Sequence, residues 1–207
     1  MLLHVGIIPD GNRRWARLRG LTLRDAYEAG YAKLKEVLRW LLDYDVRYLS
    51  FYAMSRDNCV KRGEEERGIL LGLLERAVRD IEEERILEEH DARLVISGDL
   101  SLLPERLKLS LESLAGKHRE GRRTIHVGIC YSIQWELKAN PPLPTLKLPP
   151  IDLVIRTGGM RRISGFFPLL VEYAELYFTD TLWPDFTRKE LEEAIEWFKR
   201  QVRNFGR

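Results

Sequence analysis

Cysteine is scarce in this chain, and long apolar runs are absent. The two cysteines among its 207 residues, Cys59 and Cys130, show no CxxC spacing. The sequence therefore supports neither a disulfide framework nor a structural zinc site, and we expect both residues to be reduced, half-buried thiols of a cytoplasmic protein. No apolar run approaches the roughly 18 residues that a membrane span needs, so any membrane contact is expected to be peripheral.

The chain also lacks a strong charge imbalance and the common nucleotide-binding loops. Its 34 basic and 32 acidic residues give a formal net charge of +2, and no basic tail or stripe suggests nucleic acid. Neither a GxGxxG nor a Walker pattern is present, which argues against a generic nucleotide-binding module. The first predicted strand starts within a few residues of Met1, so we expect no signal peptide.

Apolar runs rich in valine, isoleucine and tyrosine alternate with helical patterns. The capping pattern Thr187-x-x-Glu190 predicts a last helix whose apolar face runs from Leu191 to Val202. Because strands alternate with helices, we predict an α/β fold: a single domain over residues 1–207 with a central, mostly parallel six-stranded sheet flanked by helices. The predicted strands cover residues 3–9, 46–53, 92–97, 124–131, 151–156 and 175–179.

A proline-rich connector lies inside this domain. Residues 139–150 hold five of the nine prolines of the chain. Such a composition is typical of a stiff, extended segment. The connector joins two predicted strands where a parallel sheet normally uses a crossover helix.

The stretch HVGIIPDGNRRWARLRG near the N-terminus is the strongest functional signal. It begins as a β-branched strand, turns through Asp10, Gly11 and Asn12, and enters a helical segment with Arg13 and Arg14. A carboxylate at the end of a buried strand can hold a divalent cation, while backbone N–H groups and arginines face phosphate oxygens. The stretch therefore predicts a site for a metal and a diphosphate.

A simple Asp-Gly turn is the alternative interpretation, because such turns commonly end strands. A turn needs neither Trp15 nor the two arginines before it. Consecutive arginines also repel one another unless an anion lies between them. The flanking residues thus favour the anion site.

Two further polar clusters follow predicted strands, where ligands collect in parallel sheets. Arginines, hydroxyls and glycines in both clusters suit phosphate recognition. A helix cap and a solvated turn are the structural alternatives. The first cluster comprises Ser55, Asp57, Asn58, Lys61 and Arg62, and the second comprises Arg156, Arg161, Arg162 and Ser164.

The segments HVGIIPDGNRRWA, YLSFYAMSRDN, DLVIRTGG with RRIS, and AELYFTDTLWPDF, in this order, resemble those of the cis-prenyltransferases, typified by undecaprenyl diphosphate synthase. The resemblance covers most of the chain and implies a homodimer with a hydrophobic tunnel. It also implies magnesium-dependent condensation of isopentenyl diphosphate with an allylic prenyl diphosphate of the farnesyl or geranylgeranyl type. The implied product is a (Z)-polyprenyl diphosphate for lipid carrier synthesis.

The resemblance implies roles for individual residues. Asp10 is the expected essential carboxylate at the metal and diphosphate, and Glu175 is the expected second acidic residue associated with magnesium. Asn12 and Asn58 are expected to take part in catalysis with Asp10. The expected substrate-binding residues are Gly11, Asn12, Arg13, Arg14, Trp15, Arg24, Ser55, Lys61, Arg62, Arg156, Arg162 and Ser164.

Several positions depart from the family pattern. Tyr27 stands where a histidine is common, and the nearby arginine falls on Leu23, with Arg24 one residue further on. The cation after Ser-x-x-Asn is Lys61 by strict register, or Arg62 after a shift of one residue.

Asn204 occupies the arginine position of the usual C-terminal Arg-x-Gly motif. The departures leave two alternatives: a non-catalytic or regulatory subunit of a hetero-oligomeric cis-prenyltransferase, or a transferase for short chains or another acceptor. The retained carboxylate and arginines favour an enzyme, because such groups carry desolvation costs without a ligand.

Overall fold

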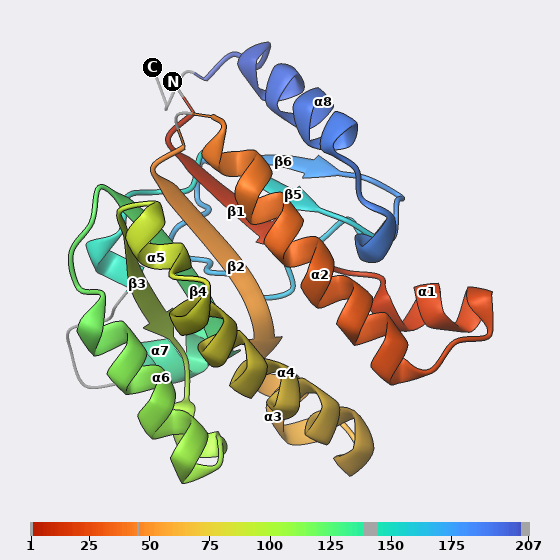
Figure 1. Cartoon of the computed structure of the whole chain (residues 1–207). Coiled ribbons are helices and arrows are strands. Elements are labelled where there is room, and N and C mark those ends of the chain that lie inside the picture. Colours follow the sequence, from red (N-terminus) through yellow and green to blue (C-terminus); the bar gives the residue numbers. More distant parts are fainter. Residues whose placement is uncertain (1, 45, 139–144, 204–207) are drawn as a thin grey trace.

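The computed structural model describes residues 2–44, 46–138 and 145–203 (Figure 1). A six-stranded sheet forms its centre in the order β3-β4-β2-β1-β5-β6, and all of these neighbours pair in parallel. The predicted α/β class and six strands are confirmed, and the sheet is fully rather than mostly parallel. The strands are β1 (His4–Ile8), β2 (Tyr48–Ser55), β3 (Ala92–Ser97), β4 (Arg123–Tyr131), β5 (Leu153–Arg156) and β6 (Glu175–Phe178).

Helices connect most of these strands, and capping boxes fix where two of them begin. Thr22 and Asp25 form a capping box at the start of α2, and Thr187 and Glu190 form the predicted one at the start of α8. The prediction for Val202 is wrong: α8 ends at Lys199, and Val202 is 83% exposed. The α-helices are α1 (Asn12–Arg19), α2 (Leu23–Leu42), α3 (Arg56–Lys61), α4 (Glu64–Glu83), α5 (Ile86–Glu89), α6 (Glu105–Lys117), α7 (Ile133–Lys138) and α8 (Arg188–Lys199), with short 3₁₀ helices η1 (Leu100–Leu102), η2 (Thr145–Lys147) and η3 (Trp183–Asp185).

One face of the sheet is covered by the long helices. Val37 and Leu41 of α2, together with Ile195 of α8, pack on Val5 and Leu153 of the central strands. The leucines of α6 and Val78 of α4 bury the same face of β3 and β4. Removing this apolar surface from water stabilises the fold by roughly 25 cal/mol per Å² buried.

The opposite face is covered by aromatic side chains from the segment that follows β5. Phe166 and Phe167 are fully buried, and they lie against strand positions without a side chain. A Cβ atom at Gly6 would lie 2.7 Å from Phe166 Cε1, and one at Gly128 would lie 2.8 Å from Phe167 Cζ. Glycine at these strand positions therefore admits the two rings.

The proline-rich connector between β4 and β5 is described from Thr145 onward, where η2 begins. Residues 139–144 of the predicted connector lie outside the described residues. Leu148 and Ile151 then pack with the two phenylalanines under the sheet.

No helix in the described part of the chain is long and apolar enough to cross a membrane.

Because all strands are parallel, their carboxyl ends meet at one edge of the sheet. Asp10 follows β1, Ser55 ends β2 and Arg156 ends β5, so the three predicted clusters lie at this edge. In sheets of this kind the carboxyl edge is where ligands bind.

Candidate active site

The turn after β1 is held by the strand end next to it. Thr157 Oγ1 accepts a hydrogen bond from Asp10 N at 3.0 Å and donates one to Asp10 O at 2.8 Å. Gly11 has a φ of 118°, and a Cβ atom there would lie 3.0 Å from Leu182 Cα. Glycine is therefore required at this position both by its backbone conformation and by the close approach.

The Asp10 carboxylate lies between two guanidinium groups. Arg156 Nη2 donates to Asp10 Oδ2 at 2.8 Å, and Arg14 Nη2 donates to Asp10 Oδ1 at 3.3 Å. The Arg156 side chain is 5% exposed, whereas those of Asp10 and Arg14 are about one third exposed. The carboxylate therefore neutralises a buried cation on one side and is accessible to solvent on the other.

Arg156 also binds the loop that follows β5. Its Nη1 donates to Ser164 Oγ at 2.8 Å and to the carbonyl oxygen of Arg162. Arg162 contributes its backbone to this contact, while the residue as a whole is exposed. The loop after β5 packs closely on the turn that contains Asp10. A Cβ atom at Gly158 would lie only 2.8 Å from Asp10 O. The structure thus brings Asp10, Arg14, Arg156 and Ser164 together.

Asn12 begins α1 and packs against α2. A Cβ atom at Gly30 would lie 2.4 Å from Asn12 Oδ1, so only glycine admits the carboxamide there. Trp183 Nε1 donates to Gly30 O at 2.8 Å and fixes the same turn of α2. Asn12 Oδ1 is buried without a hydrogen-bond partner among the described residues, and such an orphaned acceptor is uncommon away from functional sites.

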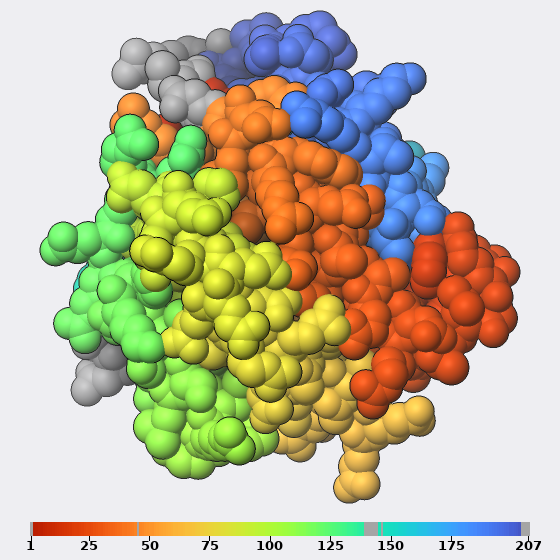
Figure 2. All heavy atoms as spheres, viewed as in Figure 1, coloured from red at the N-terminus to blue at the C-terminus, as the bar shows by residue number. Residues whose placement is uncertain are grey.

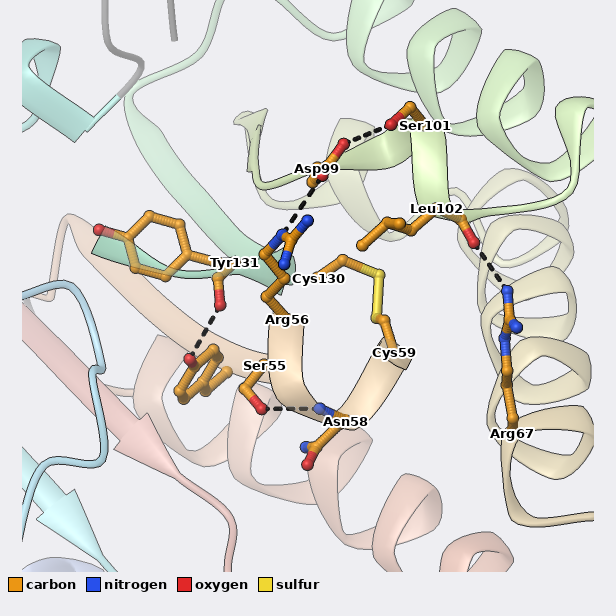
Figure 3. Close-up of a disulfide and its surroundings, with 11 residues drawn as sticks. Ser55, Arg56, Asn58, Cys59, Arg67, Asp99, Ser101, Leu102, Cys130 and Tyr131 are labelled. Carbon is orange, nitrogen blue, oxygen red and sulfur yellow. Dashed lines mark hydrogen bonds and ion pairs between the residues drawn. A yellow bond between two sulfur atoms is a disulfide. The ribbon is translucent and has the colours of Figure 1, made fainter. Parts of the chain in front are cut away.

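The cluster after β2 forms the short helix α3. Ser55 caps α3 by accepting a hydrogen bond from Asn58 N at 3.1 Å (Figure 3). Lys61 pairs with Asp57 at 3.0 Å, and its side chain is 71% exposed. Arg62 is only 20% exposed and contacts Tyr27 and Glu66 instead. Of the two candidate cations, Arg62 is the one that packs against α2.

Two other predicted residues have different surroundings. Trp15 Nε1 donates to Asp185 Oδ1 at 2.7 Å, which ties α1 to η3. Arg24 is exposed in the first turn of α2, next to the capping residue Asp25. Neither Trp15 nor Arg24 is bonded to the Asp10 carboxylate, which pairs with Arg14 and Arg156.

A disulfide joins Cys59 of α3 to Cys130 of β4 (Figure 3), which corrects the expectation of two reduced, half-buried thiols. Both residues are buried, and their Cα atoms are 5.7 Å apart. Cys130 is the extra residue of a bulge, because Met54 pairs with Ile129 and Ser55 pairs with Tyr131. The bulge and a φ of 51° at Cys130 accompany the approach to α3. A pairing across 71 residues arises from the fold and leaves no local sequence signal.

Glu175 lies far from Asp10, at the other end of the sheet. It is the first residue of β6 and pairs with Leu153, whereas Arg156, the last residue of β5, pairs with Ile8. At roughly 3.3 Å per residue, this register alone separates Glu175 from the edge of Asp10 by about 10 Å. The two carboxylates of one chain therefore cannot hold the same ion, and a metal role for Glu175 stays a prediction.

The described residues include no group of three or more His, Cys, Asp or Glu side chains placed to hold a metal ion. Arg203, the last described residue, pairs with Asp152 at 2.7 Å. Asn204, predicted to begin the altered C-terminal motif, lies outside the described residues.

Sequence reasoning missed three residues at or beside the site. Thr157 could have been found, because it directly follows Arg156 at the predicted strand end. Glu66 gave no signal, since two acidic residues precede it in the sequence. Asp185 lies in the segment AELYFTDTLWPDF, but the resemblance assigned it no role.

Comparisons with known proteins agree with this geometry. The family model described as "Putative undecaprenyl diphosphate synthase" matches residues 8–142 and 138–206. The tritrans,polycis-undecaprenyl-diphosphate synthase (geranylgeranyl-diphosphate specific) of Aeropyrum pernix is 46% identical over 220 residues, covering 98% of this chain and 97% of the relative. An isoprenyl transferase of Treponema denticola is 36% identical, with coverage of 99% and 97%.

Solved structures show the same fold. Lavandulyl diphosphate synthase from Lavandula x intermedia, in complex with dimethylallyl diphosphate, has a TM-score of 0.89 at 26% identity, covering 99% of this chain and 98% of that one. A probable undecaprenyl diphosphate synthase from Campylobacter jejuni has a TM-score of 0.80 at 25% identity, covering 100% and 99%. The resemblance seen in the sequence is thereby confirmed, and the chain belongs to the undecaprenyl diphosphate synthase family of prenyltransferases.

Proposed function

We propose that this chain condenses isopentenyl diphosphate with an allylic prenyl diphosphate to give a (Z)-polyprenyl diphosphate. The observation that carries the proposal is the group formed by Asp10, Arg14, Arg156 and Ser164 at the carboxyl edge of the sheet. It offers one accessible carboxylate and two guanidinium groups within a few ångströms. The guanidinium groups suit the phosphate oxygens of two diphosphates, and the carboxylate suits a divalent cation.

The two arginines suggest how the substrates divide the site. Arg156, with Ser164 and Arg162, would bind isopentenyl diphosphate. Arg13 and Arg14, with the free N–H groups at the start of α1, would bind the allylic diphosphate. Asp10 accepts hydrogen bonds from Arg14 and Arg156, so a phosphate oxygen can replace the carboxylate oxygen with little movement of either guanidinium.

The residues present fit Mg²⁺, which proteins usually bind through one or two carboxylates together with substrate phosphates. Asp10 would hold the ion, because its carboxylate is 32% exposed and lies at the end of a buried strand. When bound, Mg²⁺ supplies neutralisation of the charge that builds on the departing diphosphate. Glu175 of the same chain takes no part in this site.

The protein groups would act mainly by positioning and by electrostatics. Holding two diphosphates side by side brings the terminal alkene carbon of one substrate to the allylic carbon of the other. The new C–C bond would form as the allylic C–O bond to the departing diphosphate breaks, and loss of a proton would then give the new double bond. The buried Arg156 guanidinium is fixed before substrate arrives, so it stabilises developing negative charge without reorganising. Asn12 and Asn58 would orient the allylic substrate from the starts of α1 and α3.

A growing prenyl chain needs an apolar channel that excludes water. We place this tunnel between the sheet and helices α2 and α4. Leu38 of α2, Leu70 and Leu74 of α4, and Met54 of β2 pack together there. The product would extend from the carboxyl edge into this layer.

The first allylic primer to test is geranylgeranyl diphosphate, because the relative from Aeropyrum pernix is named as specific for it. A shorter primer is a second candidate, since lavandulyl diphosphate synthase was solved with dimethylallyl diphosphate and shares the whole fold. Farnesyl diphosphate completes the series. A non-catalytic subunit would use none of these primers alone and would need an active partner chain.

A homodimer is supported by the edge of the sheet at β6. This strand pairs with β5 on one side only, and Leu176 on it is 37% exposed. Leu169, in the loop before β6, is 38% exposed. A second copy of the chain would cover this apolar edge, and Leu176→Arg should then shift the mass measured by light scattering from dimer to monomer. A wild-type monomer would exclude the dimer.

Peripheral membrane contact is supported by α1. Leu18 is 72% exposed and Leu21 is 42% exposed, and both lie among the arginines of residues 13–24. Figure 2 shows this red segment as a lobe that projects from the body of the molecule. Apolar side chains among cations suit an anionic lipid surface, where a polyprenyl product could leave the enzyme. Sedimentation with phosphatidylglycerol vesicles should therefore capture the wild-type chain and release Leu18→Ser.

The decisive assay combines the purified chain with Mg²⁺, labelled isopentenyl diphosphate and each allylic primer in turn. We expect labelled products that are longer than the primer and that partition into chloroform. Absence of product with every primer, alone and with candidate partner chains, would refute the enzymatic proposal.

A further inference from the structure

Glu66 is a buried carboxylate that the chemistry above does not use. It lies in the first turn of α4 beside Glu64 and Glu65, which are exposed, whereas Glu66 is only 8% exposed. A carboxylate in the first turn is favoured by the helix dipole, but the dipole does not require burial. Burying a charge is unfavourable unless partners compensate for lost water, so the partners of Glu66 indicate what it does.

Three residues from three elements converge on one oxygen of Glu66. Its Oε1 accepts hydrogen bonds from the Tyr27 hydroxyl of α2 and from Arg62 Nη1 at the end of α3, and it lies 3.9 Å from Arg13 Nε of α1. Arg62 Nη1 also donates to the Tyr27 hydroxyl. Burial, with the bond to Glu66 as the next cause, raises the pKa of Tyr27 to about 12, so this hydroxyl stays protonated.

This cluster adjoins the Asp10 turn. Arg13 lies between Asn12 and Arg14 in the sequence, and Tyr27 lies one helical turn before Gly30, the residue that packs on Asn12. Figure 1 shows α1, the start of α2 and the junction of α3 with α4 on one side of the molecule. Glu66 therefore lies next to Arg13, one of the two arginines proposed to bind the allylic diphosphate.

We propose that Glu66 is a positioning residue for the allylic diphosphate: it holds the guanidinium groups of Arg62 and Arg13 next to each other so that both can face one diphosphate. The inference rests on the function proposed above. Two guanidiniums this close repel one another, and the carboxylate between them offsets the repulsion. A guanidinium has five N–H donors, and Arg62 uses only Nη1 for Glu66 and Tyr27, so its other N–H groups can donate to phosphate oxygens.

The alternative is a clamp that only joins α2 to α4. A second contact between these helices provides the matched control: Lys35 of α2 pairs with Glu84 at the far end of α4 at 2.9 Å. If Glu66 only joined the two helices, then weakening the other contact between them by Glu84→Gln would raise KM for the allylic diphosphate as much as Glu66→Gln does. If Glu66 merely screened the arginines, Glu66→Gln would strengthen diphosphate binding, because the cluster would become more positive.

The test is a double-variant cycle of wild type, Glu66→Gln, Arg62→Ala and the combined variant. Glutamine keeps the size and the acceptor oxygen of Glu66, and thermal unfolding would verify that each variant is folded. We expect Glu66→Gln to raise KM for the allylic diphosphate about tenfold, with kcat and KM for isopentenyl diphosphate changed less than about twofold. In the Arg62→Ala background the same substitution should add less than about twofold.

Three results would overturn the proposal: an unchanged or lower allylic KM in Glu66→Gln, the same increase in Glu84→Gln, or an undiminished effect without Arg62. Calorimetric titration of the same variants with inorganic pyrophosphate separates this inference from the proposed function. A wild-type chain that binds pyrophosphate with the expected dependence on Glu66 and Arg62, yet forms no product, would sustain the positioning role and refute the condensation.

Discussion

Arg156 donates from Nη2 to Asp10 Oδ2 at 2.8 Å and from Nη1 to Ser164 Oγ at the same distance. One buried guanidinium thus joins the turn after β1 to the loop after β5. Asp10 and Arg156 are 146 residues apart in sequence. Both contacts depend on the planar guanidinium, whose two Nη groups donate in different directions.

Arg156→Lys keeps the charge but replaces the fork with a single ammonium group, which cannot reach both partners with the same geometry. We expect KM for isopentenyl diphosphate to rise by about 10- to 100-fold, which corresponds to about 1.4 kcal/mol for each factor of ten. Steady-state kinetics would measure this. Arg122→Lys, at an ion pair with an 83% exposed arginine, is the control and should behave as wild type. A normal KM in Arg156→Lys would remove Arg156 from the substrate site.

Gly30→Ala should displace the Asn12 carboxamide, because the new Cβ would lie 2.4 Å from Asn12 Oδ1. A misplacement of this size can lower turnover by about 100-fold when the group orients substrate. Gly72→Ala, in α4 with no atom within 4 Å of the new Cβ, is the matched control. It should keep full activity and stabilise the chain by about 0.5 to 1 kcal/mol. Equal activity of the two variants would show that Asn12 is dispensable.

The disulfide should contribute substantially to stability, since it closes a loop of 71 residues. Restricting an unfolded loop of this length is worth about 4 kcal/mol in the chain-entropy account. We therefore expect the double variant Cys59→Ala, Cys130→Ala to unfold at lower denaturant concentration, and reductant to affect the wild type only. Identical unfolding of the wild type with and without reductant, after thiol titration confirms reduction, would contradict this.

The buried histidines should make stability depend on pH. His4 and His126 share a chain of hydrogen bonds with Ser50 and Ser97 across four strands. Burial lowers the pKa of His4 to about 4 and that of His126 to about 3, the latter with a smaller contribution from His4. Below the ordinary pKa of 6.5, the unfolded chain takes up protons that the folded chain refuses, so stability is lost as pH falls from about 6.5 towards 4.

The expected loss between pH 7 and 4.5 is about 2 to 3 kcal/mol for each histidine. Urea unfolding at a series of pH values would measure it. His126→Gln removes one titrating group, and its stability should fall less steeply over the same range, while the common contribution of carboxylates cancels in the comparison. An identical slope in wild type and His126→Gln would show that burial of His126 does not control the acid response.

The strands and the three polar clusters were predictable because they are local patterns. Val5 and Ile7 lie in a β-branched run that favours a buried strand, and Asp10 follows it after Pro9. Once the sheet is parallel, its carboxyl edge brings Asp10, Ser55 and Arg156 to the same side without further information.

The remaining features depend on the packing of distant segments. The pairing of Cys59 with Cys130 occurs at a bulge in β4, and the burial of Glu66 requires α2 and α4 to lie together. The role of Glu175 in metal binding stays a prediction. The strand register, which no local pattern gives, places this residue at the other end of the sheet from Asp10 of the same chain.

The central claim is that Asp10 serves metal-dependent condensation at the edge of the sheet. The most direct measurement compares incorporation of labelled isopentenyl diphosphate by wild type and Asp10→Asn, with geranylgeranyl diphosphate and Mg²⁺. We predict product from the wild type that disappears when Mg²⁺ is chelated, and a loss of at least about 100-fold in the folded variant. Turnover of Asp10→Asn at the wild-type rate would contradict the account and place the chemistry elsewhere.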